Sequence, residues 1–293
     1  MSKAARLVRN DDQKKVINAL DRLTGRYSMW ELWQDFIVMS ACAIANVFPH
    51  PNREKREKEY EQRASRYKPE EIAVFSECLM EVADAMERNP DQDFLGELFM
   101  ALGISDRWKG QFFTPYNVCR MMATMTFGEE LKQKAAERGW IGVNDPACGA
   151  GALLLAFANE CHRQHFNDQD HVLYVAQDID YLAGCMCYIQ LSLMGCPGYV
   201  VIGDSICHPS TPYDERGLIP RDEGNVWYTP MYFSGIWQGR VLWTQMDLLV
   251  SAGMNDPGPS AEADAPGPSI AGEPPQIAAV ELQEQASGQL TLF

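Results

Sequence analysis

The stretch Asn144-Asp145-Pro146-Ala147-Cys148-Gly149-Ala150-Gly151 decides the fold, because an apolar run precedes it and a helical pattern follows it. Residues 141–144 predict a buried strand, and residues 152–162 (ALLLAFANECH) predict a helix. Gly149 and Gly151 have no Cβ, so the backbone of this turn could approach a ligand closely. A Gly-rich turn that opens a helix also presents free N–H groups, and the stretch therefore predicts a nucleotide-type binding site.

Short apolar strands alternate with helical stretches after this turn. The predicted strands are residues 172–176 and 199–202, with a helix over residues 181–194 between them. This order is typical of an α/β fold with a doubly wound parallel sheet, which binds ligands at the carboxyl ends of its strands. Asp145, Asp178 and Asp204 are expected at that edge. Each acid could instead only cap the loop after its strand.

The N-terminal part is predicted to be helical over residues 11–48 and 69–103, where apolar residues recur at three- and four-residue spacing. Residues 51–68 are dense in alternating charge, which is typical of a solvated helix or loop and less often of a phosphate-contacting surface. Residues 1–68 carry 14 basic and nine acidic side chains, whereas the whole chain has a formal charge of -15. Nucleic acid would therefore meet the N-terminal part.

The C-terminal part is predicted to be less regular. We expect an irregular excursion over residues 207–240, a strand over 246–251 and a disordered tail over 253–288. Residues 251–293 contain six acidic side chains and no Lys or Arg. The predicted divisions are a helical region (1–110), an α/β domain (111–251), a disordered acidic linker (252–288) and a terminal peptide (289–293).

Cysteine and histidine usage argue against a secreted or metal-binding protein. Nine cysteines without a hydrophobic leader predict reduced thiols and a cytoplasmic location, and the five histidines lack zinc-site spacing, so no metal is expected. Cys148 is expected to pack rather than to attack, since no neighbouring basic group in the sequence would lower its pKa. The most apolar run, residues 36–48, is too short to span a bilayer and predicts a buried helix.

The form Asp-Pro-Ala-Cys-Gly-x-Gly resembles the S-adenosylmethionine loop of the adenine-specific (N6) DNA methyltransferases, particularly the modification subunits of type I restriction systems. Residues 93–99 with 110–115, residues 177–180 and residues 203–205 resemble further family segments in the same order. In that family these segments close over the methionine end of the cofactor, hold its ribose and lie near its adenine. Residues 112–115 could alternatively be an ordinary helix entry.

The resemblance implies S-adenosylmethionine as cofactor and an abbreviated α/β methyltransferase (Rossmann-like) sheet with a helical N-terminal region. It assigns cofactor contacts to Phe113, Thr114, Pro115, Asp145, Pro146, Cys148, Gly149, Gly151, Asp178 and Asp204.

The family's catalytic tetrapeptide, Asn/Asp/Ser-Pro-Pro-Tyr/Phe, binds the amino group of a flipped adenine, and this sequence has none. The weak catalytic candidates are Thr229, Pro230 and Tyr232, whose composition is more typical of an ordinary turn, and Ser251 at the end of the predicted strand. Two functions stay open. One is a DNA adenine-N6 methyltransferase of restriction-modification or mobile-element type, and the other is a cofactor-binding adaptor without catalytic activity.

The terminal peptide Gln289-Leu290-Thr291-Leu292-Phe293 resembles the motif by which bacterial proteins dock on the DNA sliding clamp. Leu290, Leu292 and Phe293 would supply apolar contacts and Gln289 a hydrogen bond, although a merely apolar chain end is the alternative. The expected partners are therefore the clamp, DNA that the chain alone binds weakly, and a separate specificity subunit. No membrane partner is expected.

Overall fold

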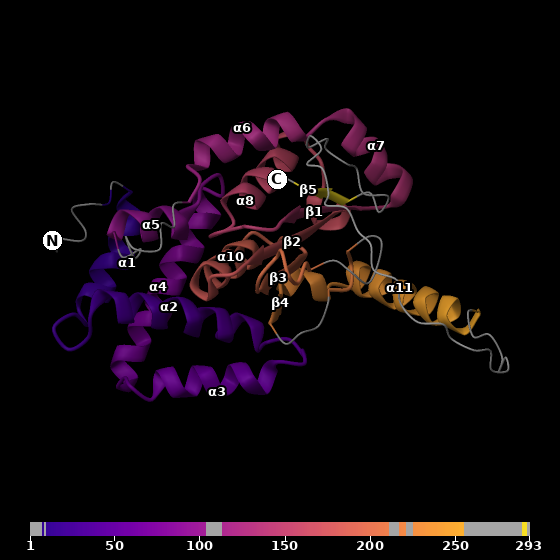
Figure 1. Ribbon diagram of the computed structural model, residues 1–293. Coiled ribbons are helices and arrows are strands. Elements are labelled where there is room, and N and C mark those ends of the chain that lie inside the picture. Colours follow the sequence, from indigo (N-terminus) through magenta and orange to yellow (C-terminus); the bar gives the residue numbers. More distant parts are fainter. Residues whose placement is uncertain are drawn as a thin grey trace, which may run out of the picture.

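The structure is a computed structural model that describes residues 8, 10–103, 113–210, 217–220, 225–254 and 289–291, with side chains to residue 250. Helices α1 to α4 form one end of the molecule, the sheet lies beside them, and helix α11 projects at the other end (Figure 1). None of the described helices is both long enough and apolar enough to cross a membrane.

The N-terminal region contains five helices with local start signals. They are α1 (Asp11–Asp21), α2 (Met29–Ala45), α3 (Arg53–Ala64), α4 (Pro69–Arg88) and α5 (Phe94–Leu102). The Asn10 side chain caps α1, and Ser28 forms a capping box at the start of α2. Each of the two long helical stretches expected from the sequence is therefore two helices. The first breaks at Gly25, where φ is +108°, and the second breaks before Pro90.

The charged segment at residues 51–68 contains helix α3, and several basic side chains of this helix contact other groups of the protein. Arg56 is buried, lies 3.7 Å from the centre of the Trp227 ring and donates to the carbonyl of Val226. Arg63 pairs with the buried Asp35 at 2.7 Å. These contacts attach α3 to α2 and to strand β4, which favours the structural alternative for this segment over phosphate contact.

Residues 141–228 together with residues 289–291 form a mixed sheet in the order β4-β3-β2-β1-β5. The strands are β1 (Ile141–Asp145), β2 (Val172–Asp178), β3 (Gly198–Ile202), β4 (Val226–Tyr228) and β5 (Gln289–Thr291). Strands β1, β2, β3 and β5 pair in parallel, and β4 pairs antiparallel to β3. The predicted α/β fold with a mainly parallel sheet and a helical N-terminal region is confirmed.

Helices α8 (Ala152–Arg163) and α10 (Tyr181–Leu193) cross over between β1, β2 and β3. Both pack on one face of the sheet, in the same continuous core as helices α1 to α7, including α6 (Tyr116–Thr126) and α7 (Glu129–Arg138). The helical region and the α/β part therefore share one hydrophobic core. The opposite face carries a second cluster built on Leu173, Val175, Tyr199 and Trp237.

Two expectations about the C-terminal part were wrong. Residues 246–251 are not a strand, because they lie within the 20-residue helix α11 (Gly235–Met254). A short apolar run such as MDLLV fits a helix as well as a strand, and no proline interrupts residues 235–254. Residues 207–240 are not wholly irregular, since they contain β4, the 3-10 helix η1 (Pro230–Phe233) and the start of α11. The boundary expected after residue 251 falls inside α11, and residues 255–288 lie outside the described part.

Candidate functional site

The turn after β1 is held by hydrogen bonds to the end of β2. The Cys148 N–H donates to the carbonyl of Gln177 at 3.0 Å, and the Gly149 N–H donates to Oδ2 of Asp178 at 2.8 Å. Asp145 accepts from the Ala147 N–H at 3.1 Å. The structure thus brings together three predicted residues, Asp145, Gly149 and Asp178, at the carboxyl edge of two neighbouring strands.

The two glycines of this turn are required for different reasons. Gly149 has φ +53°, and a Cβ there would lie 2.9 Å from Cδ1 of Phe113. Gly151 has φ +93°, and its Cβ would meet Sγ of Cys187 on helix α10 at 2.8 Å. The close neighbour is therefore an aromatic ring at Gly149 and a packed helix at Gly151.

Two carboxylates at the turn are poorly solvated. Burial raises the pKa of Asp145 to about 6, and the charge of Asp178 adds to this effect. Burial also raises the pKa of Asp178, although its hydrogen bonds from backbone N–H groups oppose the shift. Both acids would be stabilised in their ionised form by a cationic ligand next to them.

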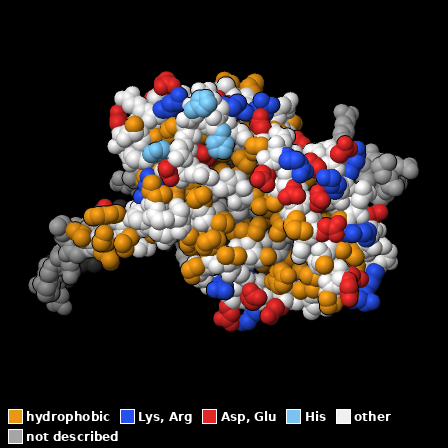
Figure 2. All heavy atoms as spheres, turned by 180° about the vertical axis from the view of Figure 1, so that it is seen from behind, with side chains coloured by type: hydrophobic (Ala, Val, Ile, Leu, Met, Phe, Trp, Pro, Cys, Tyr) orange, Lys and Arg blue, Asp and Glu red, His pale blue; other side chains and the backbone are white. Residues whose placement is uncertain are grey.

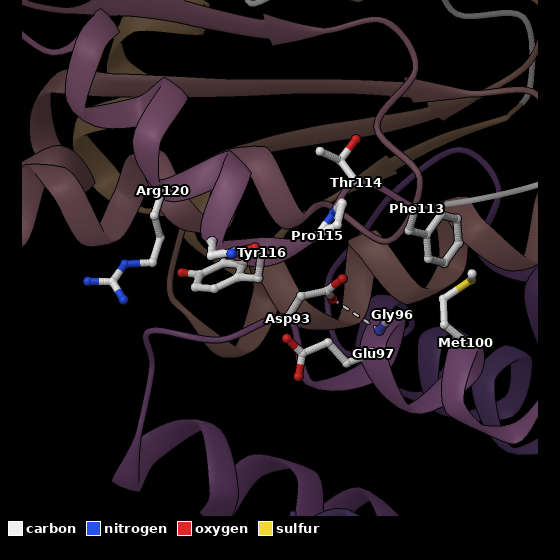
Figure 3. Close-up of a pocket in the computed structure, with 10 residues that line it drawn as sticks. Asp93, Gly96, Glu97, Met100, Phe113, Thr114, Pro115, Tyr116 and Arg120 are labelled. Carbon is white, nitrogen blue, oxygen red and sulfur yellow. Dashed lines mark hydrogen bonds between the residues drawn. The ribbon is translucent and has the colours of Figure 1, made fainter. Parts of the chain in front are cut away.

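Two cavities meet at Phe113 and Thr114. The smaller, about 230 Å³, follows the turn and is lined by Phe113, Thr114, Cys119, Asp145, Ala147, Cys148, Gly149, Ala150, Ala152 and Leu153. The larger, about 510 Å³, lies between α5 and the start of α6 (Figure 3). Phe113 and Thr114 line both cavities, and Pro115 lines the larger one, so the predicted segment Phe113-Thr114-Pro115 lies between the two. The volume of the larger cavity lies within the usual range of ligand pockets.

The larger cavity is acidic on one wall. Asp93 and Glu97 lie next to each other there, whereas the guanidinium of Arg120 points away from them (Figure 3). Burial raises the pKa of both acids, and the neighbouring Asp93 charge contributes to the shift of Glu97. Asp93 also accepts from the Gly96 N–H at 3.0 Å and so starts helix α5.

A buried glutamine connects this wall to the turn after β1. Nε2 of Gln190 donates to Oδ1 of Asp93 and to the carbonyl of Ala150, each at 2.8 Å. Its Oε1 accepts from the Leu95 N–H at 3.0 Å. The sequence predicted a family-like segment at residues 93–99 but no site role for Asp93 or Glu97. Two acidic residues at the start of a helix were a signal that could have indicated them. Gln190 carried no such signal, because its role depends on α10 lying beside α5.

Asp204 lies apart from these two cavities. Its Oδ1 accepts from the N–H groups of Ile206 and Cys207 at 2.8 and 3.1 Å, and these bonds lower its pKa. It lines a third cavity of about 190 Å³ with Gln177 and Asn225. The loop-capping alternative thus describes the contacts Asp204 makes.

The Cys148 thiol is buried beside Cys187, which raises its pKa well above the usual range, and burial adds to the effect. A neutral thiol packs but does not attack. All nine cysteines are free. In the part of the chain with described side chains, no three His, Cys, Asp or Glu residues are placed to hold a metal ion.

The catalytic candidates make internal bonds. Oγ1 of the buried Thr229 donates to the carbonyl of Cys196 at 2.7 Å and accepts from the Gly198 N–H at 3.0 Å. Pro230 lies in η1, and the Tyr232 hydroxyl donates to the carbonyl of Leu218 at 2.8 Å. The backbone of Ser251 lies in α11. Of the described side chains, those of Thr229, Pro230 and Tyr232 line neither of the two cavities that meet at Phe113.

Part of the terminal peptide is placed in the sheet. Strand β5 pairs with β1 in the register Gly142 with Gln289, Val143 with Leu290 and Asn144 with Thr291. Leu292 and Phe293 lie outside the described residues. The peptide that was expected to be free for docking therefore has its backbone engaged on the edge of β1.

The geometry fits S-adenosylmethionine in three respects. The smaller cavity is lined by the positive-φ Gly149, where an added Cβ would crowd the Phe113 ring. Asp178 at the end of β2 retains lone pairs for further donors, and the walls of the two cavities carry carboxylates suited to a cationic ligand. No side chain caps the first turn of α8, which begins at the same cavity. Pro146 lies within the turn but is not among the residues that line the cavity.

Comparisons with known proteins give a family match and a structural likeness. Residues 98–218 match the family model described as N-6 DNA Methylase. A candidate class I S-adenosylmethionine-dependent methyltransferase from Listeria monocytogenes has a similar structure, with 14% identity, a TM-score of 0.36 and coverage of 81% of this chain and 80% of the other. No curated protein matches the sequence significantly.

Proposed function

Because residues 98–218 match the N-6 DNA Methylase family model, we propose that the chain is an S-adenosylmethionine-dependent DNA adenine-N6 methyltransferase-like protein with a degenerate catalytic motif. The observation that carries the proposal is the turn after β1, where Gly149 is hydrogen-bonded to Asp178 beside the cavity at Phe113. When bound, the cofactor would supply an electrophilic methyl group on a sulfonium.

The residues of the site have distinct parts in this proposal. Asp178 accepts hydrogen bonds from the ribose hydroxyls while it continues to hold Gly149. Asp145 supplies negative charge close to the turn, and its raised pKa falls as a cationic ligand binds. Phe113 and Thr114 cover the methionine end, and Gln190 keeps the turn at a constant distance from Asp93.

Calorimetric titration of the full chain with S-adenosylmethionine tests the binding step, with S-adenosylhomocysteine as a comparison ligand. We expect both to bind. If Asp145 lies next to the ligand, its ionised form attracts the sulfonium, so the preference for S-adenosylmethionine over S-adenosylhomocysteine should be stronger above pH 6 than below it. Absence of heat and of thermal stabilisation with both ligands would exclude the proposed site.

The adaptor alternative is favoured by one observation. The sequence has no Asn/Asp/Ser-Pro-Pro-Tyr/Phe tetrapeptide, and Thr229 and Tyr232 are bonded to the protein itself. Methyl transfer from labelled cofactor to DNA, measured with and without a candidate specificity subunit, separates the two functions. Incorporation into adenine supports the enzyme, and cofactor binding without incorporation under either condition supports the adaptor.

DNA binding by the chain alone is proposed to be weak and salt-sensitive. The chain has 25 basic and 40 acidic side chains, and several basic groups of α3 are paired internally. Electrostatic binding to phosphates weakens steeply with added salt. Tight binding to one short sequence at physiological salt would contradict this.

Clamp docking through Gln289, Leu290, Leu292 and Phe293 is a second proposed interaction. The backbone groups of residues 289–291 cannot pair with β1 and lie in another protein's groove at once. We therefore propose that docking competes with strand β5. This makes the strength of the β5 pairing a determinant of clamp affinity.

A further inference from the structure

Helix α11 is anchored at its start and projects beyond the body of the protein (Figure 1). Trp237 is fully buried in the second core cluster, and Val241 packs against that cluster. The guanidinium of Arg240 donates to the carbonyls of Asp170 and Gly139. These contacts anchor the first two turns of α11, and the following turns project beyond the body of the protein.

The projecting part is largely apolar. Hydrophobic side chains gather on this projection, at the left of Figure 2. The exposed fractions are 58% for Leu242, 68% for Trp243, 38% for Met246, 42% for Leu248, 73% for Leu249 and 56% for Val250. Contiguous exposed apolar surface of this kind marks an interaction site in a folded protein.

Five of these side chains form one stripe. At about 100° per residue, Leu242, Trp243, Leu249 and Val250 all lie within about 60° of Met246 around the helix axis. Trp237 lies about 180° from Met246, on the side that faces the body. The stripe therefore points away from the protein's own core. Leu248, about 160° from Met246, lies on the far side of the helix from the stripe.

The stripe is symmetric about its central residue. Leu242 and Val250 lie four residues either side of Met246, and Trp243 and Leu249 lie three residues either side. In an antiparallel pair of identical helices centred on Met246, each apolar side chain would therefore face another apolar side chain. A two-fold interface requires this self-complementarity, because the same patch serves both subunits.

Charge favours the same partner. Between residues 241 and 250 the only charged side chain is that of Asp247, and none is basic, although the whole chain carries -15. This is a surface that a second anionic copy could approach without juxtaposed like charges along the seam. The lack of Lys and Arg gives it nothing with which to bind phosphates.

We propose that two copies of this chain associate through the apolar stripe of α11, as an antiparallel helix pair with its two-fold axis at Met246. The paired helices bury Leu242, Trp243, Met246, Leu249 and Val250 of each copy. Because α11 projects, the pairing holds the two cofactor sites apart, and neither site is covered. This inference is independent of the proposed methyltransferase function.

Sedimentation of the full-length chain across a concentration series tests the proposal. Wild type should sediment as a dimer at tens of micromolar, and Met246→Glu, which places two carboxylates together on the axis, should raise the dissociation constant at least about 100-fold. The matched control is Leu248→Glu, an equal change on the opposite face of the same helix, which should stay dimeric. A monomeric wild type, or equal disruption by both variants, would overturn the pairing. Association of the chain with a different protein but not with itself would also overturn the proposal.

Symmetric cross-linking gives a second measurement that does not depend on destabilising the interface. In a Cys207→Ser background, which removes the exposed native thiol, Met246→Cys should form an intermolecular disulfide with a copper–phenanthroline oxidant. The two thiols lose two protons and two electrons to the oxidant. Leu248→Cys should not cross-link at a comparable rate. Equal cross-linking of both variants, or none at residue 246, would place the interface elsewhere.

Discussion

The backbone N–H of Gly149 donates to Oδ2 of Asp178 across 2.8 Å, which joins the turn after β1 to the end of β2. Oδ1 of the same carboxylate accepts from the Asp180 N–H at 2.8 Å. Asp178 therefore orders its own loop and the neighbouring one, and a carboxylate has room for further donors. The proposed ribose contact depends on this one side chain.

Asp178→Ala should weaken S-adenosylmethionine binding by at least about tenfold, since a hydrogen bond to a charged acceptor contributes about 1.5–3 kcal/mol. Calorimetry measures the change. Asp11→Ala is the control. The Asp11 side chain is 89% exposed and pairs with Lys14 in helix α1, which is remote in sequence from Asp178. Unchanged affinity in Asp178→Ala would remove this acid from the site.

Gly149→Ala should lower both stability and cofactor affinity. The residue has φ +53°, where an L side chain costs about 1–2 kcal/mol, and the new Cβ would press on the Phe113 ring. Denaturant unfolding and calorimetry report the two effects. Gly128→Ala is a matched control, since φ there is negative and nothing lies within 4 Å of the added Cβ. Full affinity in Gly149→Ala would mean that the turn does not contact the cofactor.

Asp145 should make the protein less stable as the pH rises. Burial raises its pKa from 3.8 to about 6 in the folded state, so the folded protein holds this proton more tightly than the unfolded chain. Relative to Asp145→Asn, the wild type should lose up to about 3 kcal/mol of unfolding free energy between pH values of about 4 and 7. Denaturant unfolding of both proteins across that range gives the difference. A constant difference would show that Asp145 is not buried as described.

Thr229→Val should destabilise the fold by about 1–3 kcal/mol, because the carbonyl of Cys196 and the N–H of Gly198 lose their buried partner. Thr24→Val, at an exposed threonine, should cost much less. In the methyl-transfer assay Thr229→Val should retain the activity of its folded fraction. A larger loss of rate would restore Thr229 as a catalytic candidate.

A peptide of the last dozen residues should bind the bacterial sliding clamp more tightly than the full chain does, because only the full chain must first release β5 from β1. Replacing Leu292 and Phe293 together by Ala should abolish binding, since each apolar anchor contributes about 1.5–3 kcal/mol when buried. The affinity can be measured on immobilised clamp and by titration in solution. Equal affinity of wild type and the double variant would defeat the docking proposal.

The sequence alone determined the features that depend on neighbours along the chain. The alternation of strands and helices from residue 141 to 202 is confirmed to within a few residues at each end, because hydrophobic periodicity and turn glycines are local signals. The turn with Asp145 and Gly149 was found for the same reason. Its order with residues 93–99 and 177–180 carried the resemblance to the family whose model matches residues 98–218.

Tertiary structure decided what depends on distant partners. The run at residues 246–251 is helical, although its apolar pattern equally fits a strand, and the preceding turns of that helix are anchored by Trp237 in the second core cluster. Gly151 is required by Cys187, and Gln190 reaches the turn through the packing of α10 against α5. Strand β5 joins the sheet 147 positions after its partner, from Gly142 to Gln289. These contacts form between residues far apart in the chain, so no local pattern could contain them.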